Sequence, residues 1–357
     1  RSIGLPAPVT RHVSLSVNGV YFGVYLEIEN IDKQFFESRE NSALELYKSR
    51  THASRFAPPL NPFDLPIIYE PKFLTQGSLD TLGKRLSFFQ YSPPGSNTHE
   101  LVRIVDVDNL IKYFALMYAV CGWDGFDKNF YLWRRDDNRY LLIPWDCDAT
   151  FGNDWLGNFV GFESIKTFTP LLEQSLFQHL IAVPEYRRRL HVMIEFIVGE
   201  GFQIAERILS DTYDLIRHDV YLDTLMLGDM ESFDVDQQNF HDFIEGRRRN
   251  LQGLDWFYRF DVSEVTFTPE YADNRDAICN FQVRLGDVPH RAMVTIIDSA
   301  NAEVRVLLND LGENGDQIAG DLIYSTEFSF SDYTLPISLG ISIEYRPQDY
   351  FTHPPSG

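Results

Sequence analysis

Acidic side chains and one asparagine are concentrated in two short neighbouring stretches, "DGFDKNF" and "PWDCDATFG". The residues concerned are Asp124, Asp127, Asn129, Asp146 and Asp148. Carboxylates that lie close together repel one another, and their burial is costly unless a cation or a hydrogen-bond donor compensates their charge. The two stretches are therefore either polar turns at a solvated surface or the two parts of a metal-binding site.

The first stretch has a spacing that is used in phosphoryl transfer. Asp124 and Asn129 follow the pattern D-x-x-x-x-N. In a protein-kinase catalytic loop with this pattern, the aspartate accepts the substrate hydroxyl proton and the asparagine holds Mg²⁺. The pattern alone occurs by chance in many proteins, whereas its continuation into a hairpin and then D-x-D is more specific. Spacing by itself leaves both interpretations open.

A helix and a hairpin are expected to bring the two stretches together. Residues 107–120 are almost wholly apolar and predict a buried helix that ends at Cys121-Gly122, with Asp108 near its start. Residues 129–133 and 139–146 predict two strands joined by the turn sequence "RRDDN". Because an antiparallel strand returns to the start of its partner, we expect the second acidic stretch to lie beside the first.

The chain upstream of this helix predicts mostly short strands. Residues 12–29 alternate between apolar and polar side chains about Asn18-Gly19, the strongest short signal for a β-hairpin. A further strand is predicted at 44–50. Residues 54–77 are rich in Pro and Phe and predict an irregular connector that includes an extended segment, and residues 78–89 predict a helix capped by Ser78.

The rest of the chain divides into a helical part and a β part. Helical periodicity dominates from 169 to about 259, and after Phe260 short alternating strands follow one another with Gly, Asn and Asp between them. The sequence therefore predicts an α+β domain over 1–260 and a small all-β sandwich over 261–357.

Overall charge and hydropathy exclude some classes of protein. The formal net charge of −21 argues against nucleic-acid binding, which needs Lys and Arg to neutralise phosphates. No run of 18 apolar residues is present, so no membrane span is expected. The three cysteines match no zinc spacing, and three unpaired thiols are favoured over a single disulfide.

Two basic clusters stand out in this acidic chain, "EYRRRL" at 185–190 and "EGRRRN" at 245–250. Docking of an acidic protein substrate is one interpretation. The favoured one is a solvated helix surface, since Arg is rarely buried without a partner.

Several motifs in the same order resemble the CotH family, the spore-coat-protein-H kinases. They are "VNGVYFGVYLEIENID", "LYK", "YEPK", "DGFDKNFYL" and "PWDCDATFG", and the resemblance covers about 12–255. It implies an atypical protein kinase with a two-lobed kinase-like domain, which transfers the γ-phosphate of ATP to Ser or Thr of a protein substrate with Mg²⁺ or Mn²⁺.

The resemblance also implies roles for individual residues. Asp124 matches the catalytic aspartate. Asp148 is the first choice as metal ligand, together with Asp146 and Asn129. One departure from the family pattern is Cys147 between the two aspartates, which raises the question of redox sensitivity or altered metal preference.

The expected nucleotide-binding residues lie in the N-terminal strands. Lys48 matches the lysine that contacts phosphates, and lysine is scarce enough here for this match to be informative. Gly19 and Gly23 match the glycine turn that covers nucleotide phosphates. Glu29 occupies the acidic position after that turn, either orienting Lys48 or facing solvent. Lys72, with its neighbour Glu70, is a further candidate.

Two rival functions remain open at this point. A kinase-like domain that has lost catalysis would be a surface or adhesin-type binding protein, and some atypical kinases transfer AMP in place of phosphate. The acidity and the β-sandwich indicate a secreted or cell-surface protein.

The second domain carries "NDLGENGDQIAGDLIYS", which resembles a stretch of bacterial Ig-like modules. Its aspartates Asp310, Asp316 and Asp321 alternate with glycines. Such a segment can wrap Ca²⁺ with carboxylates and carbonyls, or it can form an Asx-rich turn between strands.

Overall fold

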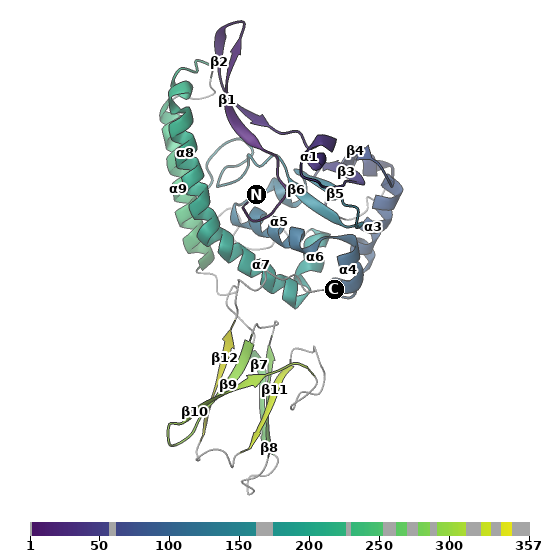
Figure 1. The fold of residues 1–357 in the computed structure, drawn as a ribbon, viewed down its shortest axis with the longest axis vertical. Helices are drawn as coiled ribbons and strands as arrows, with labels where there is room; N and C mark the ends of the chain where they lie inside the picture. The colour runs from purple at the N-terminus through teal and green to yellow at the C-terminus, as the bar shows by residue number, and fades with distance from the viewer. Residues whose placement is uncertain are drawn as a thin grey trace. The chain divides into compact units, whose positions relative to one another are not determined.

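A computed structural model gives the architecture (Figure 1). It describes residues 2–56, 62–161, 174–225, 230–252, 262–269, 278–285, 291–311, 323–329 and 337–344. The chain divides into two compact units, Arg1–Leu254 and Asp255–Gly357. The first is α+β and the second is all-β in its described part, as the sequence predicts.

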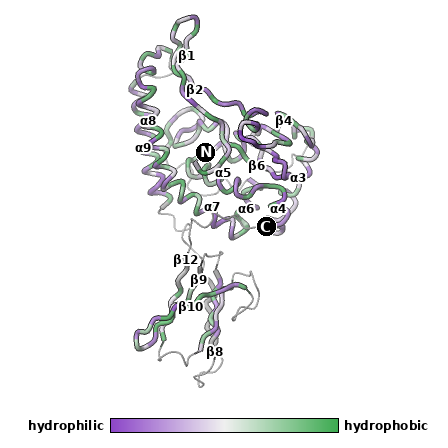
Figure 2. Tube along the Cα trace, in the orientation of Figure 1, coloured by the Kyte–Doolittle hydropathy of each residue, from purple (hydrophilic) through white to green (hydrophobic). Residues whose placement is uncertain are grey.

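The centre of the first unit is helix α5 (Val107–Ala119), which is hydrophobic along most of its length (Figure 2). Its N-cap is Asp106, whose carboxylate accepts a hydrogen bond from Asn109 N at 3.0 Å. The predicted position of Asp108 near the helix start is thus correct, but Asp108 is not the cap. Asn109 is buried and ties α5 to the neighbouring sheet, since its amide exchanges two hydrogen bonds with the backbone of Leu142.

A four-stranded antiparallel sheet covers this helix, with the strand order β4-β3-β5-β6. The strands are β3 (Glu45–Ser49), β4 (Tyr69–Leu74), β5 (Phe130–Arg134) and β6 (Tyr140–Pro144). Lys48 of β3 stands opposite Glu70 of β4 and Tyr131 of β5. The short helix α1 (Lys33–Glu37) packs against the sheet through an apolar cluster, which includes Phe35 and Phe36 of α1 and residues of β3, β5 and β6. The predicted hairpin of β5 and β6 is confirmed.

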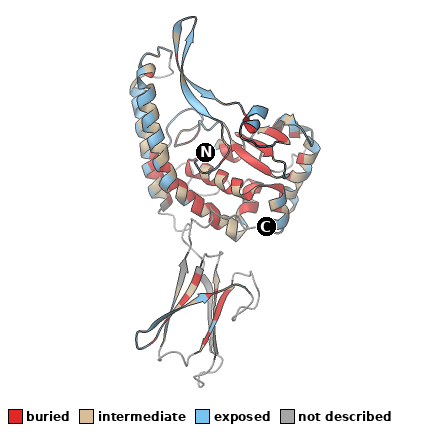
Figure 3. Ribbon diagram, in the orientation of Figure 1, coloured by how far each residue is buried: buried red, intermediate tan, exposed pale blue. Residues whose placement is uncertain are grey.

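A separate two-stranded hairpin precedes the sheet. It consists of β1 (Thr10–Val17) and β2 (Val20–Ile28), with the turn at Asn18 and Gly19, both of which have positive φ as the sequence predicts. Unlike α5 and the sheet, this hairpin is mostly exposed (Figure 3).

Helices make up most of the remaining first unit. They are α2 (Leu65–Ile68), α3 (Leu79–Tyr91), α4 (Thr98–Ile104), α6 (Ser175–Ile181), α7 (Pro184–Phe196), α8 (Phe202–Tyr221) and α9 (Met230–Gln252), with the short turns η1 (Pro62–Asp64) and η2 (Asp124–Phe126). A π-helical segment, Ile197–Gly201, joins α7 to α8. Ser78 caps α3 as predicted. In the described part of the chain, no helix is long and apolar enough to cross a membrane.

The interpretation of the two basic clusters as solvated helix surface is wrong for three arginines. Arg188, Arg189 and Arg247 are 3%, 9% and 0% exposed. Arg189 pairs with Asp108 of α5. Arg247 donates to the carbonyls of Tyr118 and Ala119, at the end of α5, where backbone acceptors lack helical partners. Arg189 and Arg247 therefore hold helices together.

The second unit contains two three-stranded antiparallel sheets, β10-β9-β12 and β11-β8-β7, in its described residues. The strands are β7 (Val262–Pro269), β8 (Ile278–Leu285), β9 (Arg291–Ile297), β10 (Glu303–Leu308), β11 (Ile323–Ser329) and β12 (Ser338–Glu344). One apolar core includes residues of both sheets, among them Phe281, Val294 and Phe328. This shared core makes the unit a sandwich, as predicted.

Candidate active site

The two acidic stretches meet at the end of α5. Asp124 begins the turn η2, five residues after the end of α5, and Asp146 lies two residues after the end of β6. Asn129 links them, because its Nδ2 lies 3.5 Å from Asp124 Oδ2 and donates to the carbonyl oxygen of Asp146 at 3.2 Å. The fold therefore brings together three residues that the spacing singled out.

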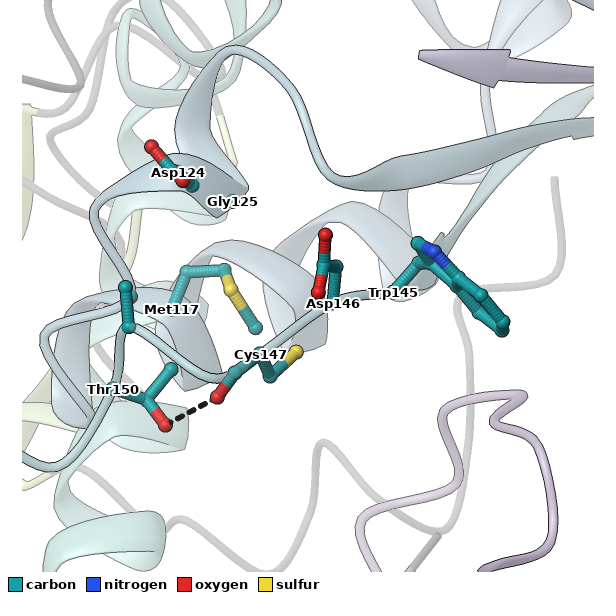
Figure 4. A pocket seen from close by; sticks show the side chains of 9 residues that line it. Met117, Asp124, Gly125, Trp145, Asp146, Cys147 and Thr150 are labelled. Atoms are coloured by element: carbon teal, nitrogen blue, oxygen red, sulfur yellow. Dashed lines mark hydrogen bonds between the residues drawn. The ribbon is translucent and has the colours of Figure 1, made fainter. Parts of the chain in front are cut away.

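A small pocket lies between these stretches (Figure 4). Its lining residues are Met117, Gly122, Asp124, Gly125, Trp145, Asp146, Cys147, Ala149 and Thr150. The close approach of Met117 explains why position 125 is a glycine, since a Cβ there would lie 2.3 Å from the Met117 sulfur. Asp148 is absent from this lining, and its carboxylate accepts a hydrogen bond from Ala149 N at 2.9 Å. Of the two aspartates in the second stretch, Asp146 is thus the one that lines the pocket together with Asp124.

Asp124 has a cationic partner that the sequence analysis missed. Lys128 Nζ lies 3.0 Å from Asp124 Oδ2, and both side chains are largely buried. The i, i+4 spacing of opposite charges in "DGFDK" is the signal that could have revealed this pair. Lys128 supplies the compensating charge that a carboxylate in this position requires.

The oxygen donors of the site suit a hard divalent cation, although no preformed metal cluster is evident. Among the residues that the structure describes, no three His, Cys, Asp or Glu side chains form a group that could hold a metal ion. Carboxylate and amide oxygens are nevertheless the ligands that Mg²⁺ prefers, and it completes its shell with water and phosphate oxygens. Asp124, Asn129 and Asp146 fit that chemistry.

Asp127 lies in the first stretch but has different partners. Its two carboxylate oxygens contact His52 Nδ1 at 2.9 Å and Arg55 Nη2 at 3.2 Å. Asp127 therefore joins the turn to residues 52–55. One of the clustered aspartates thus makes a structural contact.

Cys147 carries a free thiol. Cys147 as a residue is exposed, yet partial loss of hydration at its sulfur, followed by repulsion from Asp146 and Asp148, raises the pKa of the thiol to about 11. A thiol with this pKa stays protonated near neutral pH and is a poor nucleophile. The thiolate chemistry that redox sensing requires is therefore disfavoured.

Lys48 of β3 lies beside two aromatic rings. Its ammonium is 5.2 Å from the ring centre of Trp145 and 5.9 Å from that of Tyr131. Glu29 pairs with Arg39 at 2.6 Å, and its role in orienting Lys48 stays a prediction. Glu70 stands opposite Lys48 in the sheet and pairs with Lys72 at 2.8 Å.

The glycine hairpin contacts the end of α8. Gly23 has φ of +124°, and a Cβ there would lie 2.1 Å from a carboxylate oxygen of Asp223. That carboxylate accepts a hydrogen bond from Val24 N at 3.2 Å, and Tyr21 donates to the carbonyl of Asp219 at 2.7 Å. Gly23 is therefore required by the close approach of Asp223. Gly19 has open space around its Cα.

Helix α9 supports both sides of the site, which the sequence analysis did not anticipate. Arg247 holds the carbonyls that end α5, immediately before the turn of Asp124. Phe151, near the end of the second acidic stretch, packs against Phe240 and Phe243 at ring distances of 4.6 and 5.6 Å. The aromatic periodicity of residues 240–243 was the available signal.

Comparison with known proteins identifies the family. The family model described as CotH kinase protein matches residues 1–251. The chain belongs to the CotH kinase family. It is also 24% identical over 262 residues to the inner spore coat protein H of Bacillus subtilis (strain 168), with 70% of each chain covered. The family-model match spans nearly all of the first unit and includes the pocket with Asp124 and Asp146.

The proposed calcium segment of the second unit is only partly described. Asp310 follows β10, whereas Asp316 and Asp321 lie outside the described residues. The calcium interpretation and the turn interpretation both remain predictions.

Proposed function

We propose that this CotH-family protein transfers the γ-phosphate of ATP to Ser or Thr hydroxyls of a protein substrate. The observation that carries the proposal is that Asp124 and Asp146 line one pocket and are linked by Asn129, within the segment that matches the CotH kinase family. We propose that residues 1–260 form the kinase domain and that 261–357 form an Ig-like spacer.

Each residue has one task in the proposed reaction. Asp124 orients the acceptor hydroxyl and accepts its proton as the new oxygen–phosphorus bond forms and the bond to ADP breaks. Asp146, Asn129 and Asp148 are the residues that would hold Mg²⁺ or Mn²⁺, which neutralises phosphate charge when bound. Lys128 holds the Asp124 carboxylate in position.

The N-terminal residues are proposed to bind the nucleotide. Lys48 contacts phosphate, and Lys72 adds positive charge on the neighbouring strand. Gly19 and Gly23 give the hairpin its turn and its contact with α8, and Glu29 anchors the hairpin base through Arg39. The proposed role of the hairpin as a cover for phosphates requires that it reach the nucleotide from this anchored position.

Label transfer tests the activity and its class. Wild type, Asp124→Asn and Asp148→Asn would be incubated with ATP labelled at the α or the γ position, with Mg²⁺ or Mn²⁺ and acidic acceptor proteins. We expect γ-label in wild type and loss of incorporation in both variants. Transfer of α-label would show AMP transfer instead, and absence of label together with absence of ATP-dependent thermal stabilisation would overturn the proposal.

A binding role without catalysis is the second candidate. It is favoured by the pairing of Asp124 with Lys128, which neutralises the proposed base in this structure. A binding protein would retain its partner after Asp124→Asn. By analogy with the spore coat relative, we propose that either form is associated with a coat or a cell surface.

A further inference from the structure

We infer that Trp145 and Tyr131 are positioning residues for Lys48, and that they hold its ammonium in place of a carboxylate. This arrangement leaves the positive charge of Lys48 available to a nucleotide phosphate. The inference rests on the proposed function for its ligand, while its structural part concerns Lys48 alone.

The two rings form a corner around the ammonium. They meet edge to face, with ring centres 5.4 Å apart and planes at 86°. The Lys48 ammonium lies within about 6 Å of both ring centres, the range over which a cation is attracted to an aromatic face. Tyr131 is fixed opposite Lys48 by the pairing of β3 and β5.

Nearby carboxylates are engaged with other cations. Glu29 contacts Arg39 through both of its oxygens. Glu70 contacts Lys72 at 2.8 Å and Arg50 at 3.4 Å, and the hydrogen bond from Lys72, together with the charges of Lys72, Arg50 and Lys48, lowers the pKa of its carboxyl. Within the described parts of the chain, no carboxylate forms an ion pair with Lys48. Glu70 attracts Lys48 without forming an ion pair with it, and the two rings lie within cation–π range of its ammonium.

Trp145 connects Lys48 to the pocket. It lines the pocket and directly precedes Asp146 (Figure 4). Its backbone N donates to the carbonyl of Asn129 at 3.1 Å, so its position is tied to the loop asparagine. One residue therefore sets where the ammonium of Lys48 lies relative to Asp146 and Asn129.

The choice of partner has an electrostatic consequence. A carboxylate orients a lysine but cancels its charge, whereas an aromatic face attracts the ammonium and leaves the net charge at +1. In a chain with a net charge of −21, a lysine beside the pocket that forms no ion pair within the described residues is a specific attractor for phosphate.

Binding measurements with ATP and with adenosine, which lacks phosphates, test the inference. ATP and adenosine would be titrated into wild type, Trp145→Leu, Trp145→Phe and Tyr131→Leu, with Tyr91→Leu as the matched control on an exposed ring. We expect Trp145→Leu to weaken ATP binding by about fivefold to thirtyfold, the range of a partly desolvated cation–π contact. Adenosine binding should change little, and Trp145→Phe should restore most of the ATP affinity.

A chemical readout tests the structural part without nucleotide. The rate at which an amine-reactive reagent modifies Lys48 would be measured by mass spectrometry, with Lys72 in the same molecules as the internal reference. We expect Trp145→Leu to change the Lys48 rate and leave the Lys72 rate unaltered. Equal Lys48 rates in wild type, Trp145→Leu and Tyr131→Leu would overturn the inference.

The two readouts separate the ways in which the account can fail. Equal loss of ATP and adenosine binding would show that Trp145 stacks on the base, which contradicts the inference. If wild type binds no ATP but Lys48 reactivity responds to Trp145→Leu, the proposed function fails while the aromatic positioning of Lys48 stands.

Discussion

The α5–β6 region and the β1–β2 hairpin hold their candidate residues in different ways. The α5–β6 region comprises α5, β5, β6 and the turn of Asp124; it is buried and tied by internal hydrogen bonds such as those of Asn109 and Arg247. The hairpin is mostly exposed and reaches the end of α8 through Ser14, Tyr21 and Val24.

This difference suits two different tasks, the precise positioning of a catalytic side chain and the admission and release of a ligand. A carboxylate that handles a proton must be held within a fraction of an ångström, which a buried helix end provides. A segment that admits and releases a ligand benefits from low local stability. We therefore expect damage to the α5–β6 region to affect the whole domain and damage to the hairpin to remain local.

The largest effect is expected from Arg247→Met. It leaves the buried carbonyls of Tyr118 and Ala119 without their charged donor, which should lower the free energy of unfolding by about 3 kcal/mol. Urea unfolding measures the change. Arg249→Met, on an exposed position of the same helix, is the control and should leave the midpoint unaltered. Equal stability of both variants would contradict the proposed support of α5 by α9.

A smaller effect of pH is expected from His191 on α7, which packs against α5. Burial, followed by repulsion from Arg187, lowers the pKa of His191 to about 4 from its ordinary 6.5. Because the unfolded chain binds the proton more readily, stability should be fully present above about pH 6.5 and fall by about 2 kcal/mol as the pH drops to about 5. Unfolding of wild type and His191→Gln across this range measures it. The variant should lose less stability, and parallel profiles would contradict the assignment.

The smallest global effect is expected from Gly23→Ala. The added Cβ meets Asp223 and the positive φ is unfavourable for alanine, so the hairpin should loosen by about 1 kcal/mol. Hydrogen exchange should become faster in residues 10–28 and remain unchanged in α5. Gly157→Ala is the matched control, since its φ is also positive and its surroundings are open. Loss of protection in α5 as well would remove the contrast between the two regions.

Local patterns were sufficient to predict most elements. The Asn18-Gly19 turn, the Ser78 cap and the β5–β6 return each depend on neighbours in sequence, and each is confirmed. The convergence of Asn129 with Asp124 and Asp146 followed from antiparallel geometry alone. The α+β fold class could be predicted for the same reason, because it follows from the order of these local elements.

Long-range contacts account for what the sequence analysis missed. Arg247 is as polar as any surface arginine, and only the distant end of α5 makes its burial favourable. Asp148 and Asp146 are indistinguishable by spacing, and the bend after β6 decides that Asp146 lines the pocket. The partner of Lys48 likewise depends on strand pairing, which places Tyr131 beside it and leaves Glu29 with Arg39.

The most direct test of the central claim compares two neighbouring aspartates. Incorporation of γ-label from ATP into acceptor protein would be measured for wild type, Asp124→Asn and Asp127→Asn under identical conditions. Asp124 faces the pocket, whereas Asp127 is held by His52 and Arg55. We predict that transfer is lost in Asp124→Asn and largely retained in Asp127→Asn. Equal transfer by wild type and Asp124→Asn would contradict the assignment of Asp124 as the catalytic base.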